Sequence, residues 1–254
     1  MKRRKIGNLL RSNVQNRGSV DIKGFIDLSM VDWDDKVSAV IFLPICNFRC
    51  PFCYNVALVL TPDELPTIPF EKIESYLERH KGAIEGVVIT GGEPTVHKDL
   101  PYLCKRLKNL GFKVKLDTNG TSPSMIKELI DHSLVDYVAM DIKAPLTEEK
   151  YSRATGVDAK GFLKTAEESM NILMESGVDY EFRTTVVPTI HTEEDIKSIS
   201  KVLGGCRRYV LQNFKSEVKM IDPSFENLKP FSKEEMKTLL MAARTYVKQA
   251  KIRG

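Results

Sequence analysis

Three cysteines stand close together in the first quarter of the chain. Cys46, Cys50 and Cys53 follow a C-x3-C-x2-C spacing and make up three of the five cysteines in 254 residues. Clustered thiols in a reducing compartment favour metal binding or redox chemistry over disulfides, and the odd cysteine count favours the same conclusion. The segment therefore predicts a metal centre.

Three kinds of site are compatible with these thiols. Structural zinc usually takes four protein ligands. The other thiols and the imidazoles stand alone in the sequence: Cys104, Cys206, His80, His97, His132 and His191. Reduced, buried thiols without a metal are the second possibility. A 4Fe-4S cluster held by three thiolates is the third, and it would leave one iron open to bind a substrate.

Polar and glycine residues follow several apolar runs further along the chain. They belong to the segments GGEP, DTNG, MDIK and FRTT: Gly91, Gly92, Glu93, Pro94, Asp117, Thr118, Asn119, Asp141, Lys143 and Arg183. Adjacent glycines let a backbone approach a ligand closely. An arginine directed into the rim of a sheet requires an anionic partner. Taken singly, each segment could equally be a turn or a polar cap over a sheet.

Regular elements must position these residues. Six β-branched runs predict strands at 38–43, 86–90, 112–116, 137–142, 180–187 and 208–212. Helical spacing and caps predict helices at about 100–110 and 162–174, and others that begin at Ser122, Thr192 and Ser232. Six strand-helix units predict a parallel sheet, either doubly wound or curled into a partial barrel. Because parallel strands end at one edge, the cysteines and the polar segments are expected to meet at one rim.

Size and composition fit one α/β domain. A net charge of +4 with 28% charged residues is ordinary and gives no argument for a nucleic-acid partner. No apolar run approaches the roughly 20 residues of a membrane span, and the basic start MKRRK, expected to be a solvated tail, lacks the apolar region of a signal peptide. We therefore expect a cytoplasmic protein with an extension at 1–35, a barrel core at 36–215 and a C-terminal loop and helix at 216–254.

The cysteine spacing, with Phe52 before the third cysteine, resembles the signature of the radical S-adenosylmethionine superfamily. The resemblance implies a partial (β/α)6 TIM-type barrel with a 4Fe-4S cluster at the C-terminal rim of the parallel strands. It also implies that the open iron binds the amino and carboxylate groups of S-adenosylmethionine. One electron from the cluster would release methionine and a 5'-deoxyadenosyl radical, which abstracts hydrogen from an unreactive C–H bond.

The resemblance also implies roles for single residues. The GGEP segment (Gly91, Gly92, Glu93, Pro94) would bind the methionine amino group. Asp117, Thr118 and Asp141 would be ligands of a monovalent cation. Other expected cofactor contacts are Phe52, Asn55, Asn119, Lys143 (for the carboxylate), Arg183 and Gln212. Related activating enzymes carry a histidine after the sixth strand; here the segment is VLQNF, in which Gln212 or Asn213 is the candidate replacement.

The stretch upstream of the cysteines resembles the activating proteins of anaerobic ribonucleoside-triphosphate reductase, which are related to pyruvate formate-lyase activating enzyme. That resemblance implies that the chain installs a glycyl radical on a partner enzyme and receives electrons from a flavodoxin or ferredoxin. Only two cysteines lie outside the motif, so one cluster is expected. Two alternatives stay open: a radical enzyme that acts on a small molecule or tRNA, and a non-catalytic iron–sulfur protein.

Overall fold

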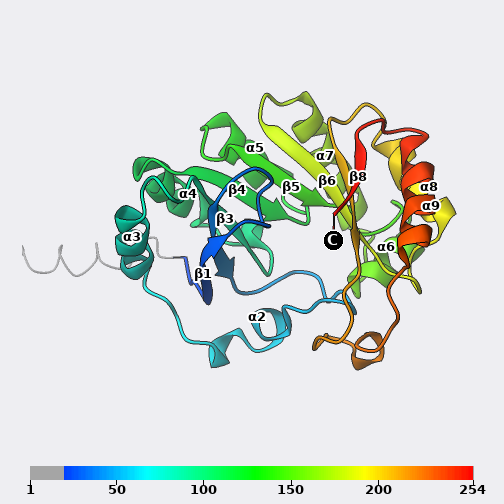
Figure 1. Cartoon of the computed structure of the whole chain (residues 1–254), viewed down its shortest axis with the longest axis horizontal. Coiled ribbons are helices and arrows are strands. Elements are labelled where there is room, and N and C mark those ends of the chain that lie inside the picture. Colours follow the sequence, from blue (N-terminus) through cyan, green and yellow to red (C-terminus); the bar gives the residue numbers. More distant parts are fainter. Residues whose placement is uncertain (1–19, 254) are drawn as a thin grey trace, which may run out of the picture.

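The computed structural model describes residues 20–253, and its centre is one curved sheet of eight strands in sequence order (Figure 1). The strands are β1 (Gly24–Ser29), β2 (Ser38–Leu43), β3 (Gly86–Gly91), β4 (Lys113–Thr118), β5 (Tyr137–Asp141), β6 (Asp179–Val186), β7 (Tyr209–Asn213) and β8 (Ala250–Arg253). Strand β1 is antiparallel to β2, and every later neighbour is parallel. The basic run at residues 2–5, predicted to be a solvated tail, lies outside the described residues.

The six predicted strands are confirmed as β2 to β7, and the α/β fold class with them. The sheet is wider than expected because β1 and β8 extend it at both edges. The β1 sequence, GFIDLS, falls within the region expected to be an extension, and AKIR of β8 lies beyond the expected core. Both strands are partly polar, and β8 has only four residues, so pairing with a neighbouring strand, rather than an apolar pattern, defines them.

Helices connect the strands. They are α2 (Val56–Leu60), α3 (Phe70–Arg79), α4 (Leu100–Asn109), α5 (Pro123–Asp131), α6 (Glu148–Thr155), α7 (Phe162–Glu175), α8 (Glu193–Val202) and α9 (Lys233–Arg244). The five predicted helices are confirmed as α4, α5, α7, α8 and α9; α2, α3 and α6 were not predicted. Capping boxes begin α8 at Thr192 and α9 at Ser232.

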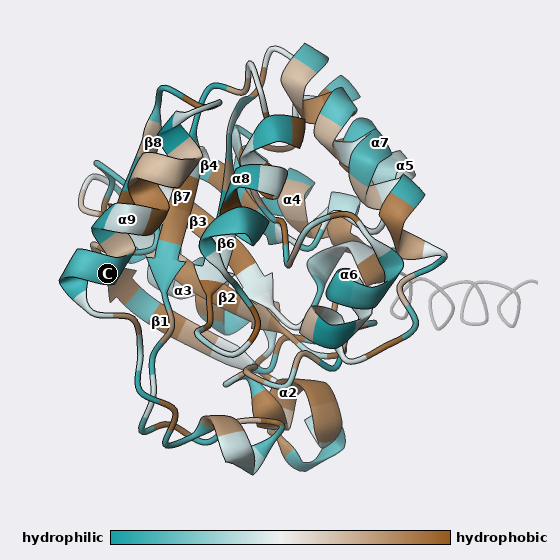
Figure 2. Ribbon diagram, turned by 90° about the vertical axis from the view of Figure 1, so that its right-hand side faces the viewer, coloured by the Kyte–Doolittle hydropathy of each residue, from teal (hydrophilic) through white to brown (hydrophobic). Residues whose placement is uncertain are grey.

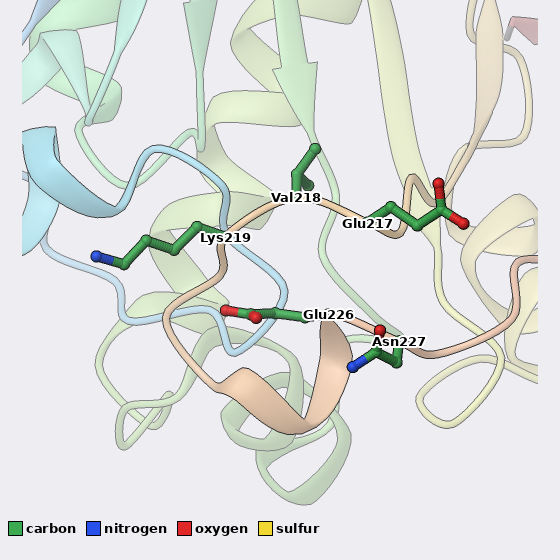
Figure 3. Close-up of a pocket in the computed structure, with 5 residues that line it drawn as sticks. All are labelled: Glu217, Val218, Lys219, Glu226 and Asn227. Carbon is green, nitrogen blue, oxygen red and sulfur yellow. The ribbon is translucent and has the colours of Figure 1, made fainter.

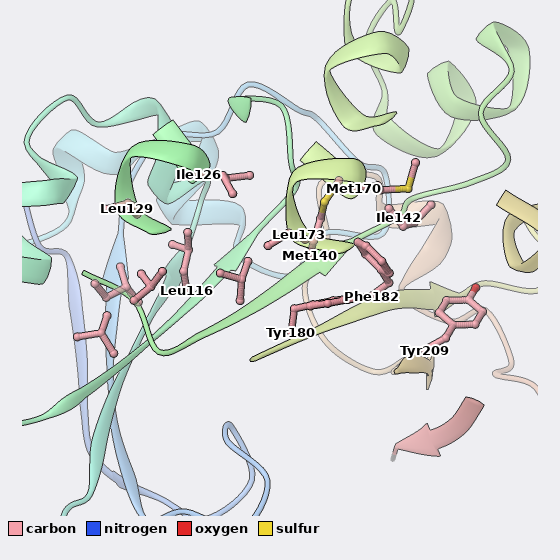
Figure 4. Packing of buried hydrophobic residues seen from close by; sticks show 14 of the residues in the cluster. Leu116, Ile126, Leu129, Met140, Ile142, Met170, Leu173, Tyr180, Phe182 and Tyr209 are labelled. Carbon is pink, nitrogen blue, oxygen red and sulfur yellow. The ribbon is translucent and has the colours of Figure 1, made fainter. Parts of the chain in front are cut away.

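The main core lies between the outer face of the sheet and these helices. In Figure 4, α5 and α7 place Ile126 and Met170 over Leu116, Met140 and Phe182 of the sheet. Hydropathy colours show the same arrangement, with brown strands inside and teal on the outer faces of α5 and α7 (Figure 2). Alternation along each strand thus sends one set of side chains to this core and the other set to the inner face.

The inner face of the curved sheet is part apolar and part charged. The loop between β1 and β2 inserts Trp33, which is 4% exposed and packs 5.9 Å from the Tyr137 ring. From β8, Arg253 donates hydrogen bonds to Glu181 of β6 (2.7 and 2.9 Å) and to Asp34 of the same loop (2.8 Å). Ion pairs therefore connect the region next to the first strand with the last strand.

The carboxyl ends of the parallel strands form one rim. The loops after β2, β3, β4, β5 and β7 all begin there, and Figure 1 shows α2 and the segment after β7 (orange) at the same end of the molecule. Across residues 20–253, none of the helices has both the length and the apolar character that crossing a membrane requires.

Candidate functional site

The cysteine loop, residues 44–55, connects β2 to α2 at this rim. Cys50 is buried, and Cys46 and Cys53 are half-buried. Backbone N–H groups fix the loop: Phe48 N donates to Cys46 Sγ (3.3 Å) and Cys53 N donates to Cys50 O (3.0 Å). One short, ordered loop thus supplies three thiols, a donor set suited to an iron–sulfur cluster.

Burial governs the protonation of these thiols. It raises the pKa of Cys46 to about 11 and that of Cys50 to about 12, although the nearby Lys143 ammonium lowers both. The pKa of Cys53 is raised for the same reason. The thiols are therefore protonated at neutral pH when no metal is bound, and loading a cluster must release their protons.

The backbone immediately before Cys46 is strained. Ile45 has φ +64°, a left-handed conformation that is rare for a β-branched residue, and its side chain is 50% exposed. Two hydrogen bonds of 2.8 Å hold it, from Ile45 N to Leu58 O and from Glu93 N to Ile45 O. The strain directs the chain from the end of β2 into the first cysteine.

Gly91 and Gly92 lie against the cysteine loop itself. A Cβ on Gly91 would lie 2.4 Å from Leu43 O, and one on Gly92 would lie 2.0 Å from Ile45 O. Gly92 N also donates to Leu43 O at 2.8 Å. The glycines thus allow a close approach of the protein's own backbone, and an approach to a ligand stays a prediction. Pro94 follows as the buried first residue of a 3-10 turn.

Glu93 is 1% exposed and its carboxylate is fully engaged within the protein. Oε1 accepts from Thr95 N (3.0 Å), Thr95 Oγ1 (2.5 Å) and Thr118 Oγ1 (2.7 Å), and Oε2 accepts from Asn119 N (2.6 Å). Burial raises its pKa despite these hydrogen bonds. The Glu93 side chain thus joins the ends of β3 and β4, and any contact with a ligand from this segment falls to its backbone.

Buried ion pairs connect the ends of β4, β5 and β6. Arg183 Nε donates to Asp141 Oδ1 (2.8 Å), Arg183 NH1 to Asp117 Oδ2 (3.2 Å), and Lys143 Nζ to Asp141 Oδ2 (2.9 Å). Burial opposes ionisation of Asp141, but the two cations outweigh it and hold its pKa at about 2. The same attraction raises the pKa of Lys143. Asp141, Lys143 and Arg183 are therefore charged at neutral pH.

The predicted cation ligands are close together, but most of their oxygens are occupied. Both oxygens of Asp141 accept from protein cations, and Thr118 Oγ1 donates to Glu93. Asp117 Oδ1 is buried without a hydrogen-bond partner among the described residues, 3.5 Å from Lys115 Nζ. A cation site here stays a prediction. Among the three residues, Asp117 has a carboxylate oxygen that accepts no hydrogen bond from the described residues and could bind a cation.

The other predicted contacts are distributed around the same rim. Asn55 Nδ2 donates to Gly91 O (2.6 Å) and so ties the end of the cysteine loop to β3. Phe52 is buried in an apolar cluster with Phe48 and therefore packs within the protein. Gln212 is half-buried on β7 beside Thr185 of β6. Asn213 donates to Phe231 O (2.8 Å) and leaves its Oδ1 buried without a partner in the described chain.

The segment after β7 covers one side of the cysteine loop. Ile221 N donates to Cys53 O (3.1 Å) and Asp222 N to Pro51 O (3.0 Å). Figure 3 shows a hollow in this segment, lined by Glu217, Val218, Lys219, Glu226 and Asn227, next to the blue chain of the N-terminal third. Hydrogen bonds from the residues after β3, after β4 and after β7 therefore all hold the cysteine loop in place.

The two remaining cysteines lie elsewhere. Cys104 on α4 and Cys206 before β7 are both buried in the main core, away from the cluster that contains Cys50. Within residues 20–253, no three His, Cys, Asp or Glu side chains form a group that could hold a single metal ion.

Sequence reasoning missed several residues that shape the site. Asn47 and Thr121 join Asn119 in a set of side-chain hydrogen bonds. His191 holds the backbone of Lys143, with Nε2 2.8 Å from Lys143 O. Asn47 lies inside the cysteine motif and Thr121 directly follows DTNG, so position in the motif was the available signal. Nothing near His191 in the sequence indicated its role.

Comparison with known proteins identifies the family. The model of the radical SAM superfamily matches residues 40–203. A Methanocaldococcus jannaschii protein, provisionally named a glycyl-radical enzyme activating enzyme, is 34% identical over 235 residues, which cover 91% of this chain and 95% of that protein. The 7-carboxy-7-deazaguanine synthase of Thermococcus kodakarensis is 34% identical over 143 residues, 56% of this chain and 53% of its own.

Solved structures share the fold at low identity. TYW1 with a lysine-pyruvate adduct bound has a TM-score of 0.61 at 18% identity, over 95% of this chain and 89% of its own. SuiB of Streptococcus suis has a TM-score of 0.62 at 17% identity over 83% of this chain, which spans about half of SuiB (47%). These likenesses support the partial barrel fold that the sequence predicted.

Three observations indicate the same family: the cysteine loop, the two glycines at the end of β3, and the match to the family model. Membership implies a 4Fe-4S cluster and S-adenosylmethionine, and the donor set at the rim fits that cluster. The prediction of the family from C-x3-C-x2-C is confirmed. The chain belongs to the radical SAM superfamily and is a radical SAM enzyme.

Proposed function

We propose that this enzyme installs a glycyl radical on a partner enzyme, such as an anaerobic ribonucleoside-triphosphate reductase. The observation that carries the proposal is the extent of its likeness to the M. jannaschii protein named as a glycyl-radical enzyme activating enzyme, which covers 95% of that protein. By contrast, the match to a Sulfurisphaera tokodaii protein named as a GTP 3',8-cyclase covers 36% of it.

The cysteine inventory supports this assignment. Three thiols share the rim, while Cys104 and Cys206 are buried in the main core. The cysteines therefore offer the ligands of one cluster and leave none for an auxiliary cluster. A low-potential flavodoxin or ferredoxin in an anaerobic cytoplasm is the electron donor that we propose.

The chain's own residues prepare the site for the reaction. When bound, the cluster supplies the electron that cleaves S-adenosylmethionine. Cys46, Cys50 and Cys53 would hold it. Arg183 pairs with two carboxylates, whereas Lys143 pairs with Asp141 alone, so Lys143 is the cation that we propose for an incoming carboxylate. Because Asp141 pairs with both cations, it fixes their positions before any ligand arrives.

Incubation with a purified candidate partner tests the proposal. The anaerobically reconstituted protein, with dithionite and S-adenosylmethionine, is expected to generate a glycine-centred doublet in the electron paramagnetic resonance spectrum of the partner. A partner variant with that glycine replaced by alanine is the control. Release of 5'-deoxyadenosine with no doublet on any candidate partner would overturn the activating role and leave the superfamily assignment intact.

A second candidate is a radical enzyme that acts on a small molecule or tRNA. The match to the 7-carboxy-7-deazaguanine synthase of T. kodakarensis, 34% identical over 143 residues, favours it, because that name describes a small-molecule product. Fold alone does not select a substrate. Filter binding with tRNA over a salt series separates the two candidates, since phosphate-driven binding weakens steeply as salt rises. If the loaded protein makes no 5'-deoxyadenosine at all, the non-catalytic alternative holds instead.

A further inference from the structure

Three side chains at the rim form a closed ring of hydrogen bonds beside the first cysteine. Asn119 Nδ2 donates to Asn47 Oδ1 (2.8 Å), and Asn47 Nδ2 donates to Thr121 Oγ1 (2.8 Å). Thr121 Oγ1 donates in turn to Asn119 Oδ1 (2.7 Å), which also accepts from Thr121 N (3.0 Å). Each donor in the ring faces an acceptor, so the three side chains fix one another.

The ring spans two parts of the chain that lie 72 residues apart. Asn47 belongs to the cysteine loop after β2, whereas Asn119 and Thr121 follow β4. Its far side is fixed as well, because Asn119 N donates to the buried Glu93 carboxylate at 2.6 Å. The cysteine loop is therefore held to the ends of β3 and β4 through side chains as well as through its own backbone.

Asn47 is the neighbour of Cys46, and the ring restrains that cysteine directly. Asn47 Oδ1 lies 3.9 Å from Cys46 Sγ, and Phe48 N, one residue further on, donates to the same sulfur at 3.3 Å. Cys46 and Phe48, which supply the sulfur and the N–H of this contact, flank Asn47 in the chain. A shift of Asn47 would therefore move both of them. Hydrogen bonds to cysteine sulfurs are among the factors that set the stability and reduction potential of an iron–sulfur cluster.

We propose that Asn47, Asn119 and Thr121 act together as a positioning clamp that holds Cys46 and its N–H···S bond in the geometry of a cluster ligand. Asn47 and Thr121 are positioning residues in this scheme, because they act through Cys46. Asn119, expected from the sequence to contact the cofactor, has its amide committed to the clamp. The proposal depends on the cluster that family membership implies and not on the identity of the substrate.

Matched substitutions test the clamp. Thr121→Val removes the hydroxyl but keeps the side-chain shape, and Asn47→Ala removes the amide. Thr121→Ser keeps a hydroxyl and is the rescue variant. Thr67→Val is the control, because Thr67 Oγ1 also donates one hydrogen bond, to Asp21 (2.8 Å), and accepts another, from Lys23 Nζ (2.9 Å), in an exposed polar group outside the site.

The readout is the reconstituted protein's rate of iron loss to a chelator, together with the spectrum and midpoint potential of the reduced cluster. Thr121→Val and Asn47→Ala are expected to lose iron about tenfold faster, the effect usual for partners of metal ligands. Their potentials should shift to more negative values, because fewer hydrogen bonds then stabilise the reduced sulfurs. Thr121→Ser and Thr67→Val should match the wild type in all three measurements.

Two results would overturn the proposal. One is a Thr121→Val protein whose iron loss, spectrum and potential equal those of the wild type. The other is a Thr67→Val protein that loses iron as fast as Thr121→Val, since general loosening of the fold would then be the cause. Should Asn47→Ala fail to fold, the comparison of Thr121→Val with Thr121→Ser decides the question alone.

Discussion

Arg183 on β6 donates a 2.8 Å hydrogen bond from Nε to Asp141 on β5, with only 10% and 23% of the two side chains exposed. The same guanidinium reaches Asp117 on β4, so one arginine joins three neighbouring strands at the site. Breaking a buried ion pair by removing one partner is costly because the other charge is left without compensation.

Replacing Arg183 with methionine is expected to lower the free energy of unfolding by about 3 kcal/mol. Denaturant unfolding followed by circular dichroism measures the change. Arg207→Met is the matched control, because its pair with Asp179 is exposed (52% and 76%) and such pairs contribute little. Equal effects of the two substitutions would contradict the structural role given to Arg183.

His191 should make stability depend on pH near neutrality. Burial lowers its pKa, Nδ1 accepts from Val187 N (3.0 Å), and the fold therefore favours the neutral ring. The unfolded chain binds a proton below its pKa of about 6.5, so stability is present above that pH and falls as pH drops, by up to about 1.4 kcal/mol per unit. Urea unfolding between pH 8 and 5.5 measures the slope.

His191→Gln should flatten that profile, and His132→Gln, which changes an exposed histidine, should leave it as it is. A wild-type slope no steeper than that of His191→Gln would show that other groups cause the pH dependence.

Ile45→Gly should stabilise the protein slightly. The left-handed conformation costs a β-branched residue about 1–2 kcal/mol, and glycine loses about 0.5–1 kcal/mol of this advantage through its greater freedom in the unfolded chain. Because the residue is half exposed, the packing lost with its side chain is limited. Thermal unfolding should show a rise for glycine and none for Ile45→Val, which keeps the branched side chain. A fall with glycine would mean that the exposed side chain makes a stabilising contact.

Alanine at Cys46, Cys50 or Cys53 should abolish both iron binding and 5'-deoxyadenosine release. Each thiol is one of the three proposed cluster ligands, and none of the other described cysteines shares the rim. Iron and sulfide analysis after reconstitution, with chromatography of the products, checks both effects. Cys206→Ala should retain the cluster. If Cys206→Ala also lost it, the assignment of ligands would need revision.

The sequence predicted β2 to β7 well because most of these strands are buried runs of β-branched or apolar residues. Ser38–Leu43 and Tyr137–Asp141 are almost entirely buried, so their composition reflects their place in the sheet. Strands β1 and β8 lack that signature. The pairing of Arg253 with Asp34 helps to hold β8 in place. These residues are 219 positions apart in the chain, and a local sequence pattern does not predict so distant a contact.

Prediction of the site was limited in the same way. The motifs indicated which residues lie together at the rim. They did not indicate which polar atoms bind a ligand and which form hydrogen bonds within the protein. Glu93 and Asn119 are engaged by neighbours from other loops, and the glycines Gly91 and Gly92 accommodate the cysteine loop. Such details depend on the relative placement of loops, which spacing along the chain does not encode.

The contact of Asp34 with β8 also bears on how the barrel would come apart. Neighbouring strands are joined by backbone ladders, which salt affects little, whereas this link between the two ends of the sheet consists of half-exposed charges on Asp34, Lys251 and Arg253. A higher ionic strength weakens these charge pairs and leaves the backbone ladders largely unchanged. The partial barrel thus has an electrostatic contact between the loop after β1 and the last strand, and we expect concentrated salt to weaken this contact before it weakens the backbone pairing of the strands.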